Sequence, residues 1–395
     1  MGIFDDEPFH RIGKLPNYVF AEINTMRAKA RRAGLDVIDL GMGNPDGATP
    51  DLVVEKLTEA ARDKRNHRYS LSRGIPHLLE EICKRYEAKF GVELDPETEA
   101  IATMGSKDGL AHLTFATIGP GDGVAMPDPS YPIHQWGVVM ADGKQVAVPM
   151  PSPEEFLTRI EDIFRGPGTK PKMILTSFPH NPTTQCVGLD FFRPLVDLAH
   201  KHGTMLVHDF AYADIVFDGY QAPSMMQVPG AKEVGVEIFS MSKSYSMPGW
   251  RVGFCVGNPK MIDALARIKS YLDYGMFQPI QIAAIIALRH CEWATAENAA
   301  MYKGRRDALI DGLRKGGWEI EPPKATMFVW GKIPDRYAWS GSLEFSKLLL
   351  HKGLVAVSPG IGFGPAGDDS VRFALVENEQ RIRQATRGIR KLLND

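Results

Sequence analysis

The chain has 395 residues, of which 44% are apolar and 24% charged, a composition typical of a soluble globular protein long enough for two domains. Because 46 basic and 48 acidic residues leave a formal net charge of −2, no general electrostatic attraction to nucleic acid or to an anionic membrane is expected. The longest apolar stretch, around Ile280 to Leu288, is far shorter than the ~20 residues needed to cross a bilayer.

Two features of the sequence indicate a reducing cytoplasm. Residues 1–7 are acidic and lack the hydrophobic region of a secretion signal. The four cysteines are scattered without the spacing of metal ligands, and we interpret them as buried thiols: Cys83, Cys186, Cys255 and Cys291. We therefore expect a cytoplasmic protein without a disulfide framework and without a metal site.

The first part of the chain is predicted to be mainly helical. An amphipathic segment is expected to form a helix that ends near Gly34, after a turn at Leu15-Pro16. Residues 37–40 form a short predicted strand that runs into a loop with Gly41 and Gly43, where a ligand carboxylate could approach the backbone, although a plain turn explains these glycines equally well. Further helices are predicted over residues 51–65 and 77–90.

From residue 100 onward, short apolar runs occur, several of them separated by helical patterns. Because the runs are apolar on both faces, they predict a largely parallel sheet that is covered by helices. The seven runs are residues 100–104, 123–126, 145–148, 173–176, 205–207, 237–240 and 252–256.

The remainder of the chain follows a different pattern. After about Asn258 it is helical to about Gly316. The tail combines predicted strands at 327–330 and 371–375 with predicted helices at 343–352 and 379–393. This change of pattern predicts a second, smaller α+β domain.

Polar residues follow several of the predicted strands, at the end where open α/β sheets bind their ligands. Ser106 and Lys107 begin a helix, whose unpaired N–H groups and dipole favour an anion, although an N-capping serine without a ligand is the commoner case. Tyr131, between two prolines, offers a rigid surface on which a planar ring could stack. Asn181, before Pro182, could donate to an oxygen. Packing and simple turns are the alternatives for these last two.

Another strand end carries a carboxylate and a phenol. Asp209 follows an apolar run and would be costly to bury unpaired, so a protonated ring nitrogen would suit it as a partner. Tyr212, three residues on, could reach a phenolate oxygen on the same ring. We interpret His208 as a histidine of the core or one that supports the site from behind.

The stretch 240–253 places Lys243 among Ser240, Ser242 and Ser244, with Arg251 eight residues later. Burial would lower the pKa of the lysine and free its amine as a nucleophile or base, while hydroxyls and an arginine can hold a phosphate. A Schiff-base lysine beside a phosphate site is what pyridoxal 5′-phosphate (PLP) chemistry requires. Alone, the stretch could equally be a surface turn, but turn chemistry does not readily explain all these features at successive strand ends.

In their order and spacing these residues resemble the fold-type I PLP-dependent aminotransferases, the class I/II or aspartate aminotransferase superfamily, from about Arg11 to the C-terminus. The matching motifs are Tyr69 before Gly74-Ile75-Pro76, Ser130-Tyr131-Pro132, Asn181-Pro182, Asp209-x-x-Tyr212, Ser240-x-x-Lys243 and Arg251. The resemblance implies a large PLP-binding domain over residues 49–290, with a mostly parallel seven-stranded sheet. It also implies a small domain from the N-terminal arm, residues 1–48, and residues 291–395.

The resemblance also implies how PLP is held. Lys243 would form the Schiff base, Asp209 would pair with the pyridinium nitrogen, and Tyr131 would stack on the ring. The phenolic oxygen of the cofactor would be held by Asn181 and Tyr212. Its phosphate would be bound by Ser106, the backbone N–H of Lys107, Ser240, Ser242 and Arg251.

Substrate binding and assembly are implied in the same way. Arg372 would clamp the α-carboxylate of the substrate with bidentate geometry, assisted by Asn181 and by the backbone of Gly43. Tyr69 would reach the phosphate in the neighbouring subunit, which implies a homodimer with shared active sites. Lys243, Asp209 and Tyr212 would be the catalytic residues.

Within the family the chain is similar to bacterial glutamate–pyruvate (alanine) aminotransferases, in residues 42–50, 209–216, 266–271 and 358–364. This likeness implies ping-pong transamination between L-alanine and 2-oxoglutarate, in amino-acid biosynthesis. Two positions depart from the wider family. Thr184 replaces the usual glycine, and Tyr271 or Leu272 stands where aspartate aminotransferases bind a distal carboxylate with arginine, which argues against aspartate as the preferred substrate.

Other functions fit less well or are left open. An LL-diaminopimelate or broad-range aminotransferase and a C–S β-lyase share the fold, and both stay open. A PLP-binding regulator would need a DNA-binding module or a basic face, which the sequence does not predict. A dinucleotide-binding oxidoreductase is disfavoured because Gly41-x-Gly43 and Gly360-x-Gly362-x-Gly364 lack the spacing and the strand-to-helix context of its phosphate fingerprint.

Overall fold

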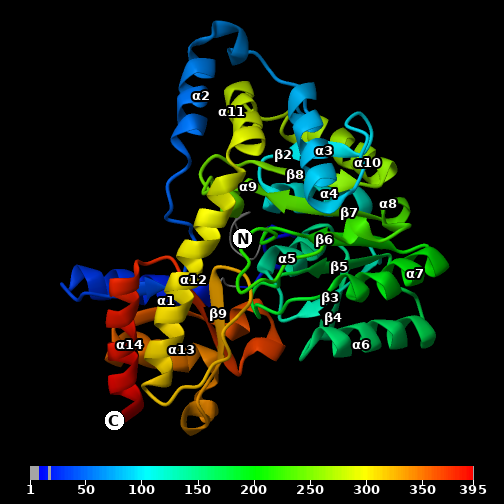
Figure 1. Ribbon diagram of the computed structural model, residues 1–395. Coiled ribbons are helices and arrows are strands. Elements are labelled where there is room, and N and C mark those ends of the chain that lie inside the picture. Colours follow the sequence, from blue (N-terminus) through cyan, green and yellow to red (C-terminus); the bar gives the residue numbers. More distant parts are fainter. Residues whose placement is uncertain (1–8, 17–18, 395) are drawn as a thin grey trace, which may run out of the picture.

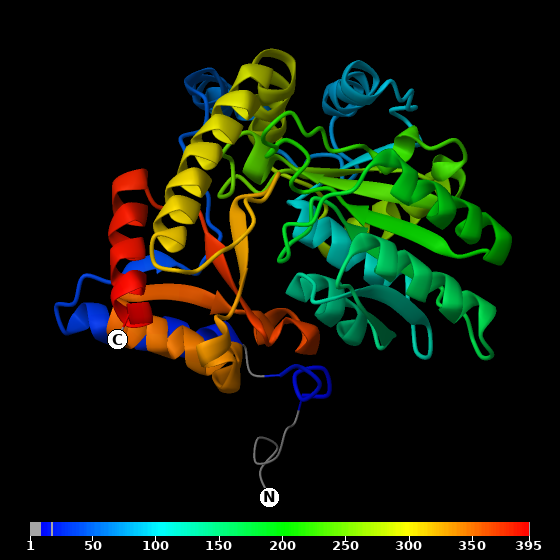
Figure 2. The same ribbon diagram turned by 60° about the horizontal axis from the view of Figure 1, so that its bottom comes forward.

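The computed structural model describes residues 9–16 and 19–394, so the expectation for residues 1–7 lies outside the described residues. The chain forms two β-sheets with helices around each (Figure 1). Helix α12 (Glu292–Arg314), yellow in Figure 2, runs from the side of the larger sheet to the smaller one. In the described part of the chain, no helix is both long and apolar enough to span a membrane.

The larger sheet has seven strands in the order β2-β8-β7-β6-β5-β3-β4, which confirms the predicted mostly parallel sheet. Its pairings are parallel from β7 through β6, β5 and β3 to β4, whereas β8 runs antiparallel to both of its neighbours. The bounds are β2 (Ala100–Thr103), β3 (Gly123–Asp128), β4 (Lys144–Pro149), β5 (Met173–Ser177), β6 (Met205–Asp209), β7 (Gly235–Ser240) and β8 (Gly253–Gly257).

Helices cover both faces of this sheet because its strands are apolar on both faces. Successive residues of a strand point to opposite faces, so Met173 and Leu175 of β5 pack in one hydrophobic cluster and Ile174 in another. The first cluster is covered by α4 (Ser106–Thr117), α5 (Pro132–Met140) and α10 (Pro259–Leu272). The second is covered by α3 (Pro76–Phe90), α6 (Pro153–Arg165), α7 (Phe192–His202) and α8 (Ala231–Val234).

The smaller sheet has the order β1-β10-β11-β9 and combines both ends of the chain. Strand β1 pairs in parallel with β10, and β11 pairs antiparallel with β10 and β9. Helix α1 packs against β10 and α13, while α12 and α14 pack together beside the sheet. The bounds are β1 (Ile38–Leu40), β9 (Phe328–Lys332), β10 (Val355–Pro359), β11 (Ser370–Ala374), α1 (Val19–Arg32), α13 (Gly341–Gly353) and α14 (Glu379–Asn394).

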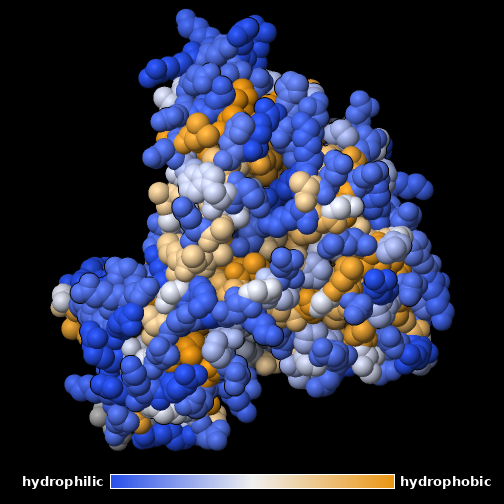
Figure 3. All heavy atoms as spheres, in the orientation of Figure 1, coloured by the Kyte–Doolittle hydropathy of each residue, from blue (hydrophilic) through white to orange (hydrophobic). Residues whose placement is uncertain are grey.

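Helices α2 (Asp51–Arg62) and α11 (Gln278–His290) pack against each other beside the larger sheet. Apolar side chains gather on the surface over these two helices (Figure 3). The helix predicted over residues 51–65 ends at Arg62, because the Asp63 carboxylate accepts a hydrogen bond from the backbone N–H of Arg65 and starts a new turn. The short helices are η1 (Lys64–His67), η2 (Leu189–Phe191), η3 (Met225–Gln227), α9 (Met241–Ser244), η4 (Asp335–Ser340), η5 (Gly360–Phe363) and η6 (Pro365–Gly367).

Candidate active site

A cavity of about 280 Å³ lies between the carboxyl ends of the parallel strands and the smaller sheet. Every residue that the sequence predicted for the site lines this cavity, except Tyr69. The two sides of the cavity come from segments far apart in the chain. The larger sheet contributes the residues after β5, β6 and β7 and the start of α4, and the smaller one contributes β10, β11 and the loop after β1.

Lys243 projects from α9, the single helical turn that follows β7. Ser240 caps this turn, since its Oγ accepts a hydrogen bond from the backbone N–H of Ser242 at 3.3 Å. Burial lowers the pKa of the Lys243 ammonium to about 8, with further lowering by Arg372 and Arg251 and an opposing effect of Asp209. At a pKa of about 8, roughly a tenth of the amine is uncharged at neutral pH, far more than for an exposed lysine.

Asp209 ends strand β6 and is held by a histidine that the sequence did not predict. The Nε2 atom of His134 lies 2.9 Å from Oδ2 of Asp209, and the N–H of Ala211 donates to Oδ1 at 3.2 Å. His134 is buried in α5, and its ring meets that of Tyr131 edge-on with centroids 5.8 Å apart. The carboxylate is therefore fixed from behind while it faces the cavity.

Arg372, on β11, is buried beside Asn181. Its Nη1 donates to Oδ1 of Asn181 at 2.7 Å, and the guanidinium carbon lies 4.0 Å and 4.5 Å from the ring centres of Phe328 and Phe363. A guanidinium that is buried and stacked between two rings is weakly hydrated. This environment favours the binding of a carboxylate by the N–H donors that lie in the guanidinium plane.

Tyr212 and Gly43 complete this side of the cavity. The Tyr212 ring packs edge-on against Phe328, with centroids 5.5 Å apart, and burial raises the pKa of its phenol, so the hydroxyl stays protonated and can donate. A Cβ atom at Gly43 would lie only 2.7 Å from the Phe328 ring, so any larger residue would displace that ring. The glycine therefore lets the backbone approach the cavity closely.

Ser106, Ser240, Ser242 and Arg251 line the same cavity near the start of α4. Gly105, at φ +86°, precedes this helix, and a Cβ atom there would collide with the Arg251 guanidinium. A Cβ at Gly253 would lie 2.7 Å from the backbone nitrogen of Ser106. The two glycines thus allow hydroxyls, an arginine and helical N–H groups to converge, a donor set that suits a phosphate dianion.

The donor set as a whole fits PLP. The phosphate cradle, a ring surface at Tyr131, a carboxylate at Asp209 and an amine at Lys243 line one cavity. The cavity is also lined by basic side chains, which favour the binding of anions: Lys107, Arg251, Arg372 and Lys243.

Tyr69 and His208 do not line the cavity. Tyr69 is 90% exposed, and its ring meets Tyr274 edge-on at 5.5 Å. His208 is buried, with Nδ1 3.1 Å from Oγ1 of Thr176 and Nε2 3.1 Å from the carbonyl oxygen of Phe178. Burial lowers the pKa of the imidazole to about 4, so it is neutral. His208 is therefore a core histidine, one of the two roles that the sequence left open.

Helix α1 adds residues that sequence reasoning missed. Phe20, Ile23 and Asn24 line the cavity, and Phe20 packs edge-on against Phe363 with centroids 5.1 Å apart. The amphipathic pattern predicted this helix but gave no signal that its apolar face covers the site. Asp39 lines the cavity too, and it is paired with Arg27 of α1.

Comparison with known proteins agrees with this geometry. Residues 35–389 match the family model of the class I and II aminotransferases. Glutamate-pyruvate aminotransferase AlaC of Escherichia coli K12 is 54% identical over 384 residues, which are 97% of this chain and 93% of that protein. LL-diaminopimelate aminotransferase of Halothermothrix orenii is 41% identical over 375 residues, 95% of this chain and 96% of that protein. The structure of an aspartate aminotransferase from Thermotoga maritima matches with a TM-score of 0.90 at 27% identity, covering 98% of this chain and all of that one (100%).

Proposed function

Because the chain belongs to the class I and II aminotransferase family, we propose that it transfers the amino group of L-alanine to 2-oxoglutarate, giving pyruvate and L-glutamate. PLP is the cofactor of this family and fold. One observation carries the proposal: Lys243, Asp209 and Arg372 converge on one small cavity. The similarity to glutamate-pyruvate aminotransferase AlaC supports the substrate pair.

Different residues of the cavity would bind different parts of PLP. Ser106, the backbone of Lys107, Ser240, Ser242 and Arg251 hold the phosphate, and Tyr131 provides the ring surface. Asp209, held by His134, pairs with the ring nitrogen and keeps it protonated. Asn181 and the protonated Tyr212 hold the phenolic oxygen. PLP, once bound to Lys243, supplies the electron sink for the charge left when Cα loses its proton.

The remaining residues act on the substrate. Arg372 binds the α-carboxylate, and Asn181 and the Gly43 backbone lie beside it. With the cofactor bound, the free amine of Lys243 would take the proton from the substrate Cα and would return a proton during the reverse half-reaction. A pKa of about 8, lowered mainly by burial and further by Arg372 and Arg251, suits both directions of this transfer.

We also propose a homodimer in which Tyr69 reaches the partner's phosphate site. Its ring is exposed and lies outside its own cavity. Other large apolar side chains, near it in sequence, at the end of α10 or in the loop after α10, are exposed as well, namely Leu71, Tyr271, Leu272 and Tyr274. Such exposed aromatic and aliphatic groups favour an interface between subunits.

Two further expectations stand as proposals. The four cysteines are free thiols, which supports a reducing cytoplasm. We expect a large domain over residues 49–290 and a small domain from residues 1–48 and 291–395. This division is supported by the separate hydrophobic clusters beside the two sheets and by the pairing of β1 with β10 in the smaller sheet.

The test is an assay of the purified protein with paired substrates. L-Alanine with 2-oxoglutarate should yield pyruvate, and Lys243→Ala should abolish both turnover and the absorbance of bound PLP near the visible edge. LL-diaminopimelate serves as the rival donor, because an LL-diaminopimelate aminotransferase is 41% identical to the chain. Release of ammonia from cystathionine would instead indicate a C–S β-lyase, and wild-type protein that binds no PLP would contradict the proposal.

A further inference from the structure

A cluster of charged residues with a buried centre lies outside the catalytic cavity, next in sequence to its residues. It joins Arg85 and Lys89 of α3, Asp214 after β6, Tyr245 after α9 and Glu292 at the start of α12. The side chains of Arg85 and Asp214 are only 4% and 1% exposed. Neither residue lines the catalytic cavity.

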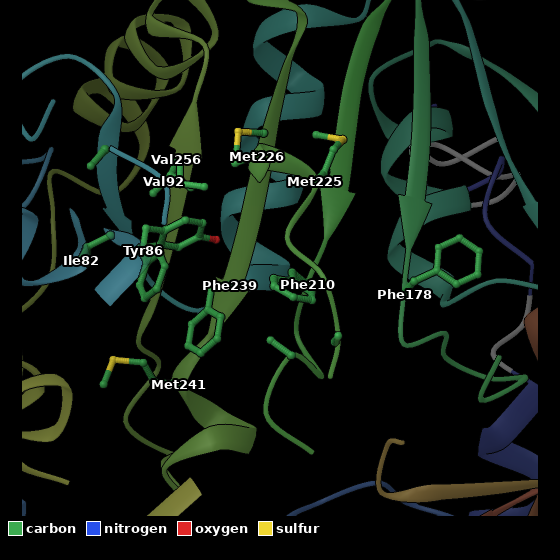
Figure 4. Packing of buried hydrophobic residues seen from close by; sticks show 14 of the residues in the cluster. Ile82, Tyr86, Val92, Phe178, Phe210, Met225, Met226, Phe239, Met241 and Val256 are labelled. Atoms are coloured by element: carbon green, nitrogen blue, oxygen red, sulfur yellow. The ribbon is translucent and has the colours of Figure 1, made fainter. Parts of the chain in front are cut away.

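Arg85 is the centre of this cluster. Its Nη2 donates to Oδ2 of Asp214 at 2.6 Å, while Nη1 donates to the hydroxyl oxygen of Tyr245 at 3.0 Å and to Oε2 of Glu292 at 2.6 Å. The guanidinium carbon also lies 4.9 Å from the ring centre of Phe239. Figure 4 shows Phe239 near the end of its strand, beside Tyr86 of α3 and close to Met241.

The partners of Arg85 are close in sequence to the proposed catalytic residues. Tyr245 comes two residues after Lys243, and Asp214 comes two residues after Tyr212. Phe239 immediately precedes Ser240, which caps the turn that carries Lys243. A single buried side chain therefore contacts each of the segments on which the lysine, the phenol and the capping serine are placed.

Charge balance alone does not account for an arginine here. Arg85 and Lys89 each pair with both Asp214 and Glu292, so two cations face two carboxylates, and a lysine in place of Arg85 would supply the same charge. What arginine adds is a planar fork of donors that holds two acceptors at a fixed separation, which the single ammonium of a lysine cannot do. Because a buried ion cluster is weak evidence for stability, a role in fixing geometry is the better account of it.

The short helix α9 has a second attachment on α12. Nδ2 of Asn298 donates to the carbonyl oxygen of Ser244 at 2.9 Å, and the Ser246 hydroxyl lies 3.1 Å from Oδ1 of the same asparagine. Without the fork of Arg85, α9 would stay attached at this side and could tilt about it. Loss of the fork should thus displace Lys243 without unfolding the segment.

We propose that Arg85 is a positioning residue, which fixes α9 against the Tyr212–Asp214 segment and so sets where the Lys243 amine lies in the cavity. The inference rests on the proposed function only in that Lys243 is taken as the reacting lysine. It assigns no contact between Arg85 and the substrate or PLP.

The main variant is Arg85→Lys, which keeps the buried charge but not the fork. Tyr245→Phe removes the hydroxyl that accepts from Arg85 and donates to Oε2 of Glu292, both at 3.0 Å, and is a second test if the first variant does not fold. The matched control is Arg289→Lys, because Arg289 also binds α3, through Oε1 of Glu81 at 2.6 Å, but contacts no segment of the site. Folding is checked by the melting temperature of each full-length protein.

The first readout does not depend on activity. In the cofactor-free protein, the reaction of Lys243 with trinitrobenzenesulfonate is followed against pH by mass spectrometry of its peptide. The wild-type midpoint should lie at a pKa of about 8, set by burial, Arg372, Arg251 and Asp209. In Arg85→Lys and Tyr245→Phe, we expect the midpoint to rise by roughly half a unit or more, as a displaced amine regains solvent.

The second readout is the half-reaction with L-alanine, measured as the loss of bound-PLP absorbance. We expect its maximal rate to fall by roughly 10- to 100-fold in Arg85→Lys, with little change in the L-alanine concentration at half-saturation, because misplacement affects the reacting geometry more than binding. The double variant Arg85→Lys with Tyr245→Phe should lose little more than Arg85→Lys alone, since both changes break the hydrogen bond between Arg85 and Tyr245.

If the folded variants lower the melting temperature but leave the Lys243 midpoint unchanged and the half-reaction within twofold of wild type, Arg85 is only structural and the inference is wrong. A shift of similar size in Arg289→Lys would contradict it as well. Failure of the proposed function looks different, because the wild-type protein itself would then show no half-reaction with L-alanine, whatever the variants do.

Discussion

At the scale of single residues, the site depends on where charge is placed. Asp209 and Lys243 follow buried strands, where an unpaired charge is costly, and for this reason the sequence could identify them. His134 could not be identified in the same way. It lies one turn after the predicted Tyr131, and its contact with Asp209 depends on how α5 is rotated against the sheet, which packing decides.

Arg372 gives a direct test at this scale. Arg372→Lys keeps the charge but loses the bidentate geometry and the stacking between Phe328 and Phe363. We expect kcat/KM for L-alanine to fall by roughly 100-fold, a loss of about 3 kcal/mol in transition-state binding, while PLP absorbance is retained. Steady-state kinetics with an absorbance control measures both quantities. An unchanged kcat/KM would show that Arg372 does not bind the substrate carboxylate.

The buried Glu237 predicts a pH dependence of stability. Burial raises its carboxyl pKa to about 7, although Tyr86, Ser224 and the backbone of Met225 donate to it. This pKa lies above the ordinary value of 4.5, so between these two pH values the folded protein binds more protons than the unfolded chain. The free energy of unfolding therefore falls as pH rises from about 4.5 through 7.

Glu237→Gln should remove that dependence. The stabilising contribution of the protonated carboxyl, on the order of 1–3 kcal/mol, should be present at low pH and lost by about pH 7 in wild type only. The measurement is the free energy of unfolding of both proteins across this range. Parallel pH curves for the two proteins would show that the pKa of Glu237 is the same in the folded and unfolded states.

At the scale of helices and strands, the hydrophobic patterns predicted where the elements form better than which other elements they contact. Strand β10 lies inside the smaller sheet and was not predicted, because only Leu354 separates it from the end of α13 at Gly353. Leu354 adopts φ +54°, a conformation more usual for glycine, so the helix end carries no glycine at that position. Helix α1 was predicted, but its place over the cavity was not.

The position of α1 predicts an effect on substrate choice. Phe20 lines the cavity and packs against Phe363, so Phe20→Ala should enlarge the space for the substrate side chain. We expect kcat/KM for a branched donor such as L-valine to rise by roughly 10-fold relative to L-alanine. Phe9→Ala is the control, because the Phe9 ring is exposed and does not line the cavity. An unchanged preference would place the substrate side chain elsewhere.

At the scale of the whole molecule, the sequence predicted a mostly parallel sheet and a second α+β region, but not how they meet. The parallel pairing of β1 with β10 closes the cavity by bringing the loop with Gly43 against Arg372. Residues of β1 and β10 that pair are more than 300 positions apart in the sequence. The residues of one strand do not indicate which other strand it pairs with, so this pairing could not be predicted from local patterns. The resemblance to a known family, rather than pattern, supplied that part of the prediction.

The proposed shared site can be tested with mixed subunits. Lys243→Ala and Tyr69→Ala should each have little or no activity as homodimers. In a mixed dimer, one site combines Lys243 of one subunit with Tyr69 of the other, so refolding the two variants together should restore activity. Mixing without refolding is the control. No gain on refolding together would show that Tyr69 does not act across subunits.

The central claim is that Lys243 holds PLP in a cavity built for L-alanine and 2-oxoglutarate, and one spectral titration tests it most directly. Purified protein loaded with PLP is treated with L-alanine, and then with 2-oxoglutarate after the pyruvate is removed. The account predicts that the absorbance near the visible edge disappears with L-alanine and returns with 2-oxoglutarate, and that Lys243→Ala shows neither change. A wild-type spectrum that L-alanine leaves unaltered would contradict it.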